Sequence, residues 1–101
     1  MWEAIMQIAN QQYPFTATTI LDGSVSVGTT AAALTTGSVP CRGVEVTALA
    51  ANTDYILIGN SGSQNKRLNA GDSVFVSIDN VQKIWGKSNS GTQTATYLGV
   101  A

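Results

Sequence analysis

The stretch SVPCRGVEVTALAANTDYILIGNSG, which spans residues 38–62, decides the fold because it holds the most regular alternation in the chain. In RGVEVTALA the side chains of Val44, Val46 and Ala48 share one face, which predicts a half-buried strand. YILIG is apolar on both faces, which predicts a central strand over residues 55–58. The residues AANTD between these runs are typical of a turn. The stretch therefore predicts two core strands joined by a turn.

The chain on the N-terminal side of this stretch contains a strong local turn signal. TATTILDGSVSVG consists of two alternating runs around Asp22-Gly23, and this dipeptide is typical of a two-residue hairpin turn. The sequence therefore predicts a hairpin in which Ile20 faces Val25. In the same register Thr18 faces Val27.

The chain on the C-terminal side continues with a period of two. SVFVSI places Val74, Val76 and Ile78 on the inner face of a predicted strand, and TQTATYLGV places Ala95 and Tyr97 on the inner face of the last one. Thr and Ser are abundant at the outward positions, which suits a sheet face that is wet or meets another polar sheet.

Turn residues interrupt the chain about every 8 to 12 residues beyond Phe15, and this spacing is typical of an all-β sandwich or barrel. We therefore expect a single antiparallel β-sandwich or jelly-roll-like domain of about six to eight short strands over residues 16–101. We expect no helix within residues 16–101.

The first 15 residues form a separate part of the chain. Trp2, Ile5, Met6 and Ile8 fall near helical spacing, and Pro14 would stop a helix soon afterwards, so we expect a short N-terminal helix or arm over residues 1–15. A helix of about ten residues is marginal alone. Trp2, Ile5 and Met6 must therefore pack on the same domain or on a neighbouring subunit, and together with Trp85 they are the interface candidates.

Composition limits the function. A chain of 101 residues holds one domain, and only 11% of its residues are charged, less than half the usual share of about 25%. The five basic and six acidic residues form no basic stripe, so we expect no nucleic-acid partner. The longest apolar run falls short of the roughly 18 residues that span a bilayer, and the N-terminus lacks a basic region typical of a secretory signal. We therefore expect no membrane partner and synthesis in the cytoplasm.

Catalytic side chains are scarce. The sequence has no histidine, which removes the usual general base, the Ser-His and Cys-His pairs and the commonest zinc ligand. The cation nearest to the only cysteine, Cys41, is Arg42, which would point to the opposite face of an extended strand. We therefore interpret Cys41 as a small buried residue at the start of a strand.

Carboxylates and ligand-binding loops fit no better. Asp72 and Asp79 lie at the two ends of a predicted strand, roughly 20 Å apart, too far for a glycosidase pair, and Asp72 after Gly71 is typical of a turn. LDGSVS and NAGDS lack the ligand ladder of a calcium loop, and GKS at residues 86–88 lacks the rest of a phosphate loop. The sequence predicts no catalytic residue, no cofactor-binding residue and no metal ligand, and hence not an enzyme.

A longer pattern covers about the last 60 to 65 residues. A proline, a cysteine and a basic residue lead into V-x-V, an A-N-T turn and a strand ending in I-G; then come L-x-x-G-D-S, a D-N-V corner, an Ile-Trp pair, and S-G before Y-L. The positions are Pro40, Cys41, Arg42, Val44, Val46, Asn52, Ile58, Gly59, Leu68, Gly71, Asp72, Ser73, Asp79, Asn80, Val81, Ile84, Trp85, Ser90, Gly91, Tyr97 and Leu98.

This pattern resembles that of small β-sandwich virion structural proteins of tailed bacteriophages. The resemblance implies a virion component without enzymatic activity, typically a capsid decoration (cement) protein, a head-fibre base or a tail module. We expect a homo-oligomer, for which we assume a trimer, that binds the phage major capsid protein or another virion protein. Its location would be the virion.

Two other functions stay open. One is a receptor- or glycan-binding module of a phage tail or head fibre, in which Trp85 would stack on sugar with help from Asn60, Gln64 and Asn65. The other is a small enzyme that uses Cys41 or a carboxylate.

Overall fold

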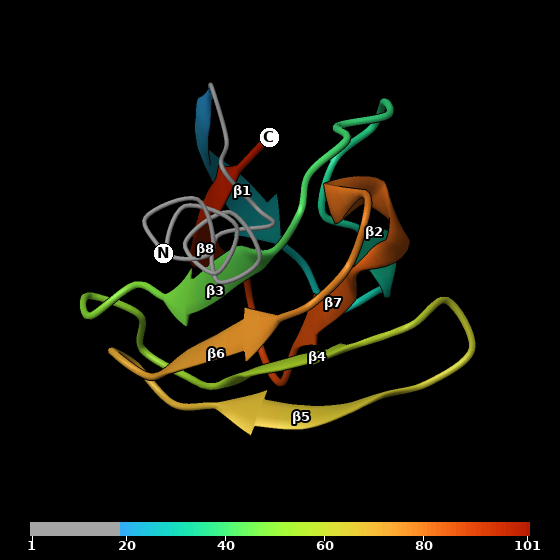
Figure 1. The fold of residues 1–101 in the computed structure, drawn as a ribbon. Helices are drawn as coiled ribbons and strands as arrows, with labels where there is room; N and C mark the ends of the chain where they lie inside the picture. Colours follow the sequence, from blue (N-terminus) through green and yellow to red (C-terminus); the bar gives the residue numbers. More distant parts are fainter. Residues whose placement is uncertain (1–18) are drawn as a thin grey trace, which may run out of the picture.

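The structure is a computed structural model that describes residues 19–101 (Figure 1). Its elements are β1 (Ile20–Val27), β2 (Ala32–Ala33), β3 (Val44–Ala48), β4 (Ile56–Gly59), β5 (Gln64–Leu68), β6 (Ser73–Val76), the 3-10 turn η1 (Val81–Lys83), β7 (Trp85–Ser88) and β8 (Gln93–Val100). The described part of the chain is thus all-β, as predicted, and its eight strands fall within the expected number.

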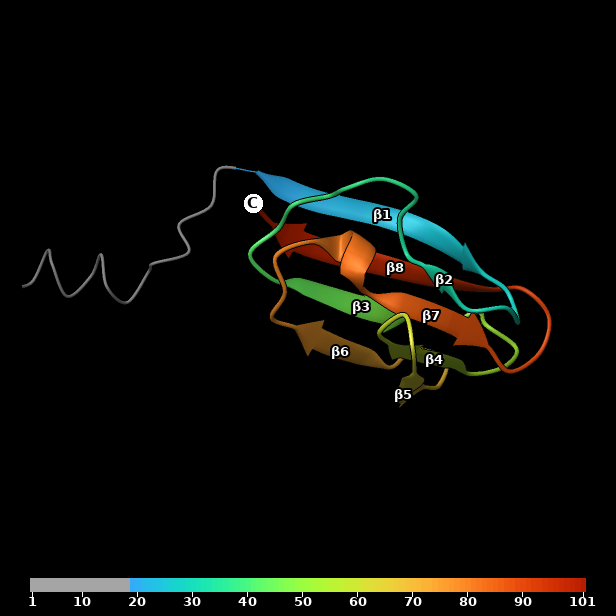
Figure 2. The same cartoon turned by 90° about the vertical axis from the view of Figure 1, so that its right-hand side faces the viewer.

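The strands form two four-stranded sheets, which we call the first sheet, with the order β1-β8-β3-β6, and the second sheet, with the order β2-β7-β4-β5. All pairs are antiparallel, and β1 pairs with β8, β2 with β7, β3 with β6 and β4 with β5. The chain is therefore one long hairpin wrapped into two layers, which is the topology of a jelly roll. In Figure 2 β1 and β6 lie at opposite margins of the first sheet.

The core lies between the sheets and follows the predicted alternation. In β3 the side chains of Val44, Val46 and Ala48 are fully buried, and in β4 Ile56 and Ile58 are buried while Leu57 is half-buried on the other face. β4 lies between β7 and β5, so the predicted central strand is confirmed. Each buried Val or Ile side chain contributes about 1.5–3 kcal/mol.

The two C-terminal predictions also hold. β8 buries Ala95 and half-buries Tyr97, and Val74 and Val76 of β6 pack against the core. β6 ends at Val76, so Ile78 lies beyond the strand, but it too packs against the core.

The predicted hairpin at Asp22-Gly23 is wrong. β1 runs without interruption through both residues and pairs along its whole length with β8, so that Ile20 lies opposite Val100 and Gly23 opposite Tyr97. A Cβ atom on Gly23 would lie 2.5 Å from the Tyr97 ring. The glycine therefore makes room for an aromatic ring across the sheet, and pairing with a distant strand overrides the local turn signal.

The predictions for the first 18 residues lie outside the described residues. These are the helix or arm over residues 1–15, the boundary at residue 16, the interface candidates Trp2, Ile5 and Met6, and the pairing of Thr18.

Candidate functional site

The outer face of the first sheet carries a group of exposed apolar side chains at one end. Ile20, Phe75, Leu98 and Val100 are 75%, 66%, 56% and 38% exposed. They come from β1, β6 and β8, so the group reaches from one edge strand of the sheet to the other. We call these four residues the apolar end.

The pairing register holds the apolar end together. Ile20 lies opposite Val100, while Glu45 of β3 lies opposite Leu98 on one side and Phe75 on the other. The four side chains line a shallow hollow of about 250 Å³ together with Gly43, Glu45 and Gly99. The surface is apolar apart from one central carboxylate.

Gly43 shapes this hollow. Its φ of 149° lies in the region that favours glycine, and a Cβ atom there would lie 2.7 Å from the Phe75 ring. The missing side chain lets the Phe75 ring lie over the backbone just before β3. A flat aromatic surface results at the edge of the sheet.

The other end of the same face is polar. Its outward side chains are hydroxyls: Ser24, Ser26, Thr47, Ser73, Thr94 and Thr96. Thr47 Oγ1 and Ser73 Oγ share a hydrogen bond of 2.7 Å across β3 and β6. The first sheet therefore presents one face with an apolar half and a hydroxyl half.

Trp85, the one interface candidate among the described residues, lies on the other sheet. It is half-buried and lies opposite Ala33 on β2 and Gly59 on β4. An open hollow of about 510 Å³ is lined by Ala33, Asn60, Ser61, Gln82, Lys83 and Trp85. Trp85 and Asn60 thus line the same hollow, as the glycan hypothesis requires.

Gln64 and Asn65, the other two glycan candidates, do not join this hollow. Gln64 is buried, and its Nε2 donates to the carbonyl oxygen of Asn60 at 2.7 Å. Asn65 Nδ2 donates to Ser63 Oγ at 2.8 Å. These amides stabilise the β4–β5 turn, and sequence spacing alone could not separate that role from ligand binding.

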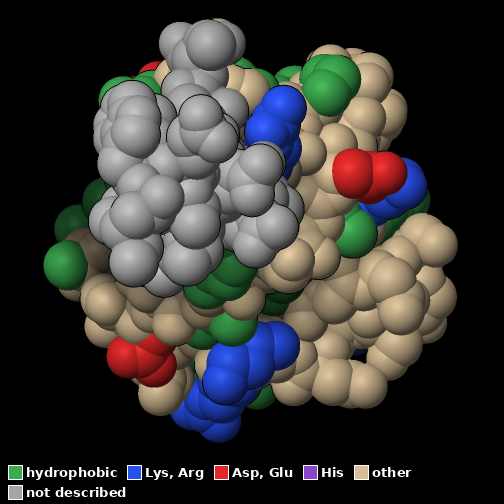
Figure 3. All heavy atoms as spheres, in the orientation of Figure 1, with side chains coloured by type: hydrophobic (Ala, Val, Ile, Leu, Met, Phe, Trp, Pro, Cys, Tyr) green, Lys and Arg blue, Asp and Glu red, His purple; other side chains and the backbone are tan. Residues whose placement is uncertain are grey.

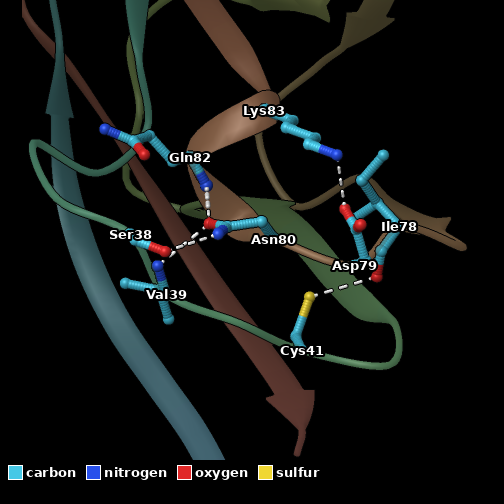
Figure 4. A network of polar contacts seen from close by, with 8 residues as sticks. All are labelled: Ser38, Val39, Cys41, Ile78, Asp79, Asn80, Gln82 and Lys83. Atoms are coloured by element: carbon cyan, nitrogen blue, oxygen red, sulfur yellow. Dashed lines mark hydrogen bonds and ion pairs between the residues drawn. The ribbon is translucent and has the colours of Figure 1, made fainter.

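Cys41 is buried, as predicted, but it lies three residues before β3 and not at the start of the strand. Its thiol donates to the carbonyl oxygen of Ile78 at 3.2 Å, and its backbone N–H donates to that of Asp79 at 2.9 Å (Figure 4). Arg42 next to it is exposed. The environment of the thiol is therefore that of a packed residue.

Asn80 joins the segment before β3 to the segment after β6. Its Oδ1 accepts from the backbone N–H of Val39 at 2.9 Å and of Gln82 at 3.0 Å, while its Nδ2 donates to Ser38 Oγ at 2.6 Å (Figure 4). Asn80 is also the N-cap of η1, and it forms an isolated β-bridge with Pro40. We call this group of contacts the Asn80 clamp. The sequence did not predict this clamp, because Asn80 and its partner Val39 lie 41 residues apart in the chain.

Asp54 is the centre of a hydrogen-bonded polar cluster formed by the loop before β4 and the loop after β7. Its Oδ2 accepts from Ser90 Oγ at 2.6 Å and Asn89 Nδ2 at 2.9 Å, and its Oδ1 accepts from the N–H of Tyr55 at 2.8 Å. These bonds, that of Ser90 first, lower the pKa of Asp54 from its ordinary value of 3.8. The Arg67 guanidinium covers the Tyr55 ring at 3.8 Å, so this aromatic face is occupied.

The Asp54 cluster predicts a pH-dependent contribution to stability. Because the pKa is lower in the folded protein, the bonds stabilise it at neutral pH, and this stabilisation is lost as pH falls below 3.8. We expect Asp54→Asn to be less stable than wild type at pH 7 and the difference to shrink toward pH 2 in urea titrations. Ser90→Ala should change stability in the same direction. A difference that is equal at pH 7 and pH 2 would contradict the assignment.

Charged groups are sparse on the described surface. In Figure 3 the Lys and Arg side chains gather at the lower edge over β5, which carries Lys66 and Arg67. Asp79 and Lys83 form an exposed ion pair of 2.8 Å. Within residues 19–101 no three His, Cys, Asp or Glu side chains are grouped to hold a metal ion, and no helix there has the length and apolarity to cross a membrane.

Comparisons of the chain with protein-family models, curated proteins and solved structures find no match.

Proposed function

We propose that this chain is a non-enzymatic structural protein of a bacteriophage virion, and more specifically a capsid decoration protein. It forms a homo-oligomer, taken as a trimer, and stabilises the head by binding across major capsid protein subunits. This proposal rests on the sequence resemblance together with one structural observation, the Asn80 clamp.

The clamp supports the resemblance because it joins two separate parts of the phage-like pattern. Pro40 and Cys41 begin that pattern, and Asp79, Asn80 and Val81 form its corner. In the fold Cys41 N–H donates to the carbonyl oxygen of Asp79, and the N–H of Val81 donates to that of Val39 at 3.0 Å. The start of the pattern and its corner are thus hydrogen-bonded to each other, as expected if the resemblance in sequence reflects a similar fold. Fold alone does not fix function, since jelly rolls also occur in lectins and cupins.

The surface of the domain supports the oligomer. A stable interface buries about 800 Å² on each partner and is poor in charge at its centre. The hydroxyl half of the first sheet offers a face whose outward side chains are uncharged. Within residues 19–101 the strands β1 and β6 have no neighbouring strand on one side, and closed symmetry is one way to cover such edges.

The test is the protein content of purified virions from the phage that encodes this chain. We expect mass spectrometry to find the chain in DNA-filled particles in high copy number, and a reconstruction to place it across capsid subunits. Absence from purified virions would refute the proposal. Presence only in the tail would refute the decoration role.

A second candidate function is glycan binding by a fibre module, favoured by the hollow beside Trp85. An indole face next to amide and ammonium groups suits a sugar ring with a polar rim. We expect, under this function, that Trp85→Ala abolishes binding on a glycan array. Lys87→Ala, on the same strand and face but outside the hollow, should keep it. An array without any binding by the wild-type protein would exclude this candidate.

A further inference from the structure

The apolar end is the most unusual part of the described surface. Four large apolar side chains, Ile20, Phe75, Leu98 and Val100, lie exposed together around one hollow. By their exposed fractions they present on the order of 400 Å², as large as the largest apolar patch on a typical monomer. Patches of this size are often functional.

We propose that the N-terminal segment of the same chain, residues 1–18, docks on the apolar end through Trp2, Ile5 and Met6. This inference does not depend on the proposed function. It concerns which surface the N-terminal segment recognises, whatever particle or ligand the domain binds.

The size of the patch favours a short segment over a second copy of the domain. A stable interface between two copies needs about 800 Å² from each, which is roughly twice the apolar end. One amphipathic segment presents a narrow apolar stripe and needs no more than a groove of this size. In residues 1–18 the apolar residues Trp2, Ile5, Met6 and Ile8 fall on one side at helical spacing, and Glu3 falls outside that side.

The place where the described chain begins favours the same chain over a neighbour. Thr19 pairs with Ala101 through two backbone hydrogen bonds of 3.0 and 2.9 Å, directly beside Ile20 and Val100. The preceding residues therefore start at the margin of the apolar end.

The length of the intervening chain allows this docking. Residues 9–18 span up to roughly 33 Å when extended, while the first sheet is only about 14 Å wide across its four strands. A segment tethered this closely has an effective concentration in the millimolar range at its own domain. A neighbouring copy in dilute solution cannot compete with that concentration.

Charge is compatible with this occupant. The apolar end has Glu45 at its centre and Asp22 opposite Leu98, so a strongly acidic partner would be repelled. The segment carries Glu3 as its single charged side chain among 18 residues. Its apolar side can therefore meet the patch without bringing a carboxylate to Glu45.

The experiment uses the full chain with Trp85→Phe, so that Trp2 is the only tryptophan. We expect blue-shifted emission from Trp2 and weak quenching by acrylamide. Adding Phe75→Thr and Leu98→Thr should shift the emission to that of a solvent-exposed indole and raise the quenching constant several-fold. Thr96→Ala, on the same strand and face but in the hydroxyl half, should change neither.

Two outcomes would overturn the proposal. The first is a Trp2 that is already fully exposed in the Trp85→Phe protein, or that keeps its emission when Phe75 and Leu98 are replaced while circular dichroism confirms folding. The second outcome concerns whether the N-terminal segment docks on its own domain or on that of a neighbouring copy. Chains that keep Trp2 but carry Trp85→Phe, Phe75→Thr and Leu98→Thr are unfolded and refolded together with a second kind of chain. The second kind keeps Phe75 and Leu98 but carries Trp2→Phe and Trp85→Phe. We expect no recovery of the blue shift, and recovery would assign the docking to a neighbouring copy.

Discussion

Replacing Gly59 by alanine is expected to lower the free energy of unfolding by about 2–4 kcal/mol. Gly59 ends β4 where the register with β5 shifts, and an added Cβ atom would lie 2.1 Å from the carbonyl oxygen of Ser63 and 2.7 Å from Cα of Gln64. Both obstacles are backbone atoms, so no side chain can rotate away. The two strands would have to separate, which would weaken the hydrogen bond from Asn60 N–H to Ser63 at 2.9 Å.

Urea unfolding followed by circular dichroism measures this effect. The matched control is Gly28→Ala, because a Cβ atom at position 28 has no neighbour within 4 Å and its φ is not positive. We expect the control to stay within about 0.5 kcal/mol of wild type. A Gly59→Ala protein as stable as the control would show that the β4–β5 turn differs from the structure described.

Replacing Asn80 by alanine is expected to cost about 2–4 kcal/mol. The substitution removes the N-cap of η1, which contributes about 1 kcal/mol, and leaves the N–H of Val39 without its acceptor, at a further cost of about 1–3 kcal/mol. It also breaks the bond to Ser38. The segments before β3 and after β6 would then be held by their backbone bonds and by the bonds of the Cys41 thiol and the Gln82 amide.

Asn80→Asp separates the contributions of the clamp. An aspartate keeps the oxygen that accepts from Val39 and Gln82 but loses the Nδ2 donor to Ser38, so we expect a smaller loss than with alanine. Asn65→Ala removes a single exposed amide bond and should cost less than about 0.5 kcal/mol. Equal stability of wild type and Asn80→Ala in urea titrations would mean that the clamp does not stabilise the fold.

The candidate sites could be predicted only in part. Trp85 was identifiable as a large aromatic in a polar stretch, and it does lie beside Asn60. The burial of Gln64 could not be foreseen, because an amide in a turn looks the same in sequence whether it points to solvent or to a backbone carbonyl. The apolar end was not predictable either, since Ile20, Phe75 and Leu98 come from three strands with no local relation to one another.

The sequence by itself determined which side of β3, β6 and β8 faces the core. Val44, Val46 and Ala48 are buried because a strand alternates its side chains locally, whatever strand lies beside it. The burial of Cys41 was predicted by a different argument, because a reactive thiol requires partners that the sequence lacks.

Only the tertiary structure decided which strand pairs with which. Asp22-Gly23 has the local preference of a turn, yet it lies inside β1, because full-length pairing with β8 and the Tyr97 ring over Gly23 outweigh that preference. The Asn80 clamp and the apolar end arise in the same way from segments distant in sequence. A side chain's orientation within a strand depends on its own backbone, whereas its neighbours depend on how the whole chain closes into two sheets.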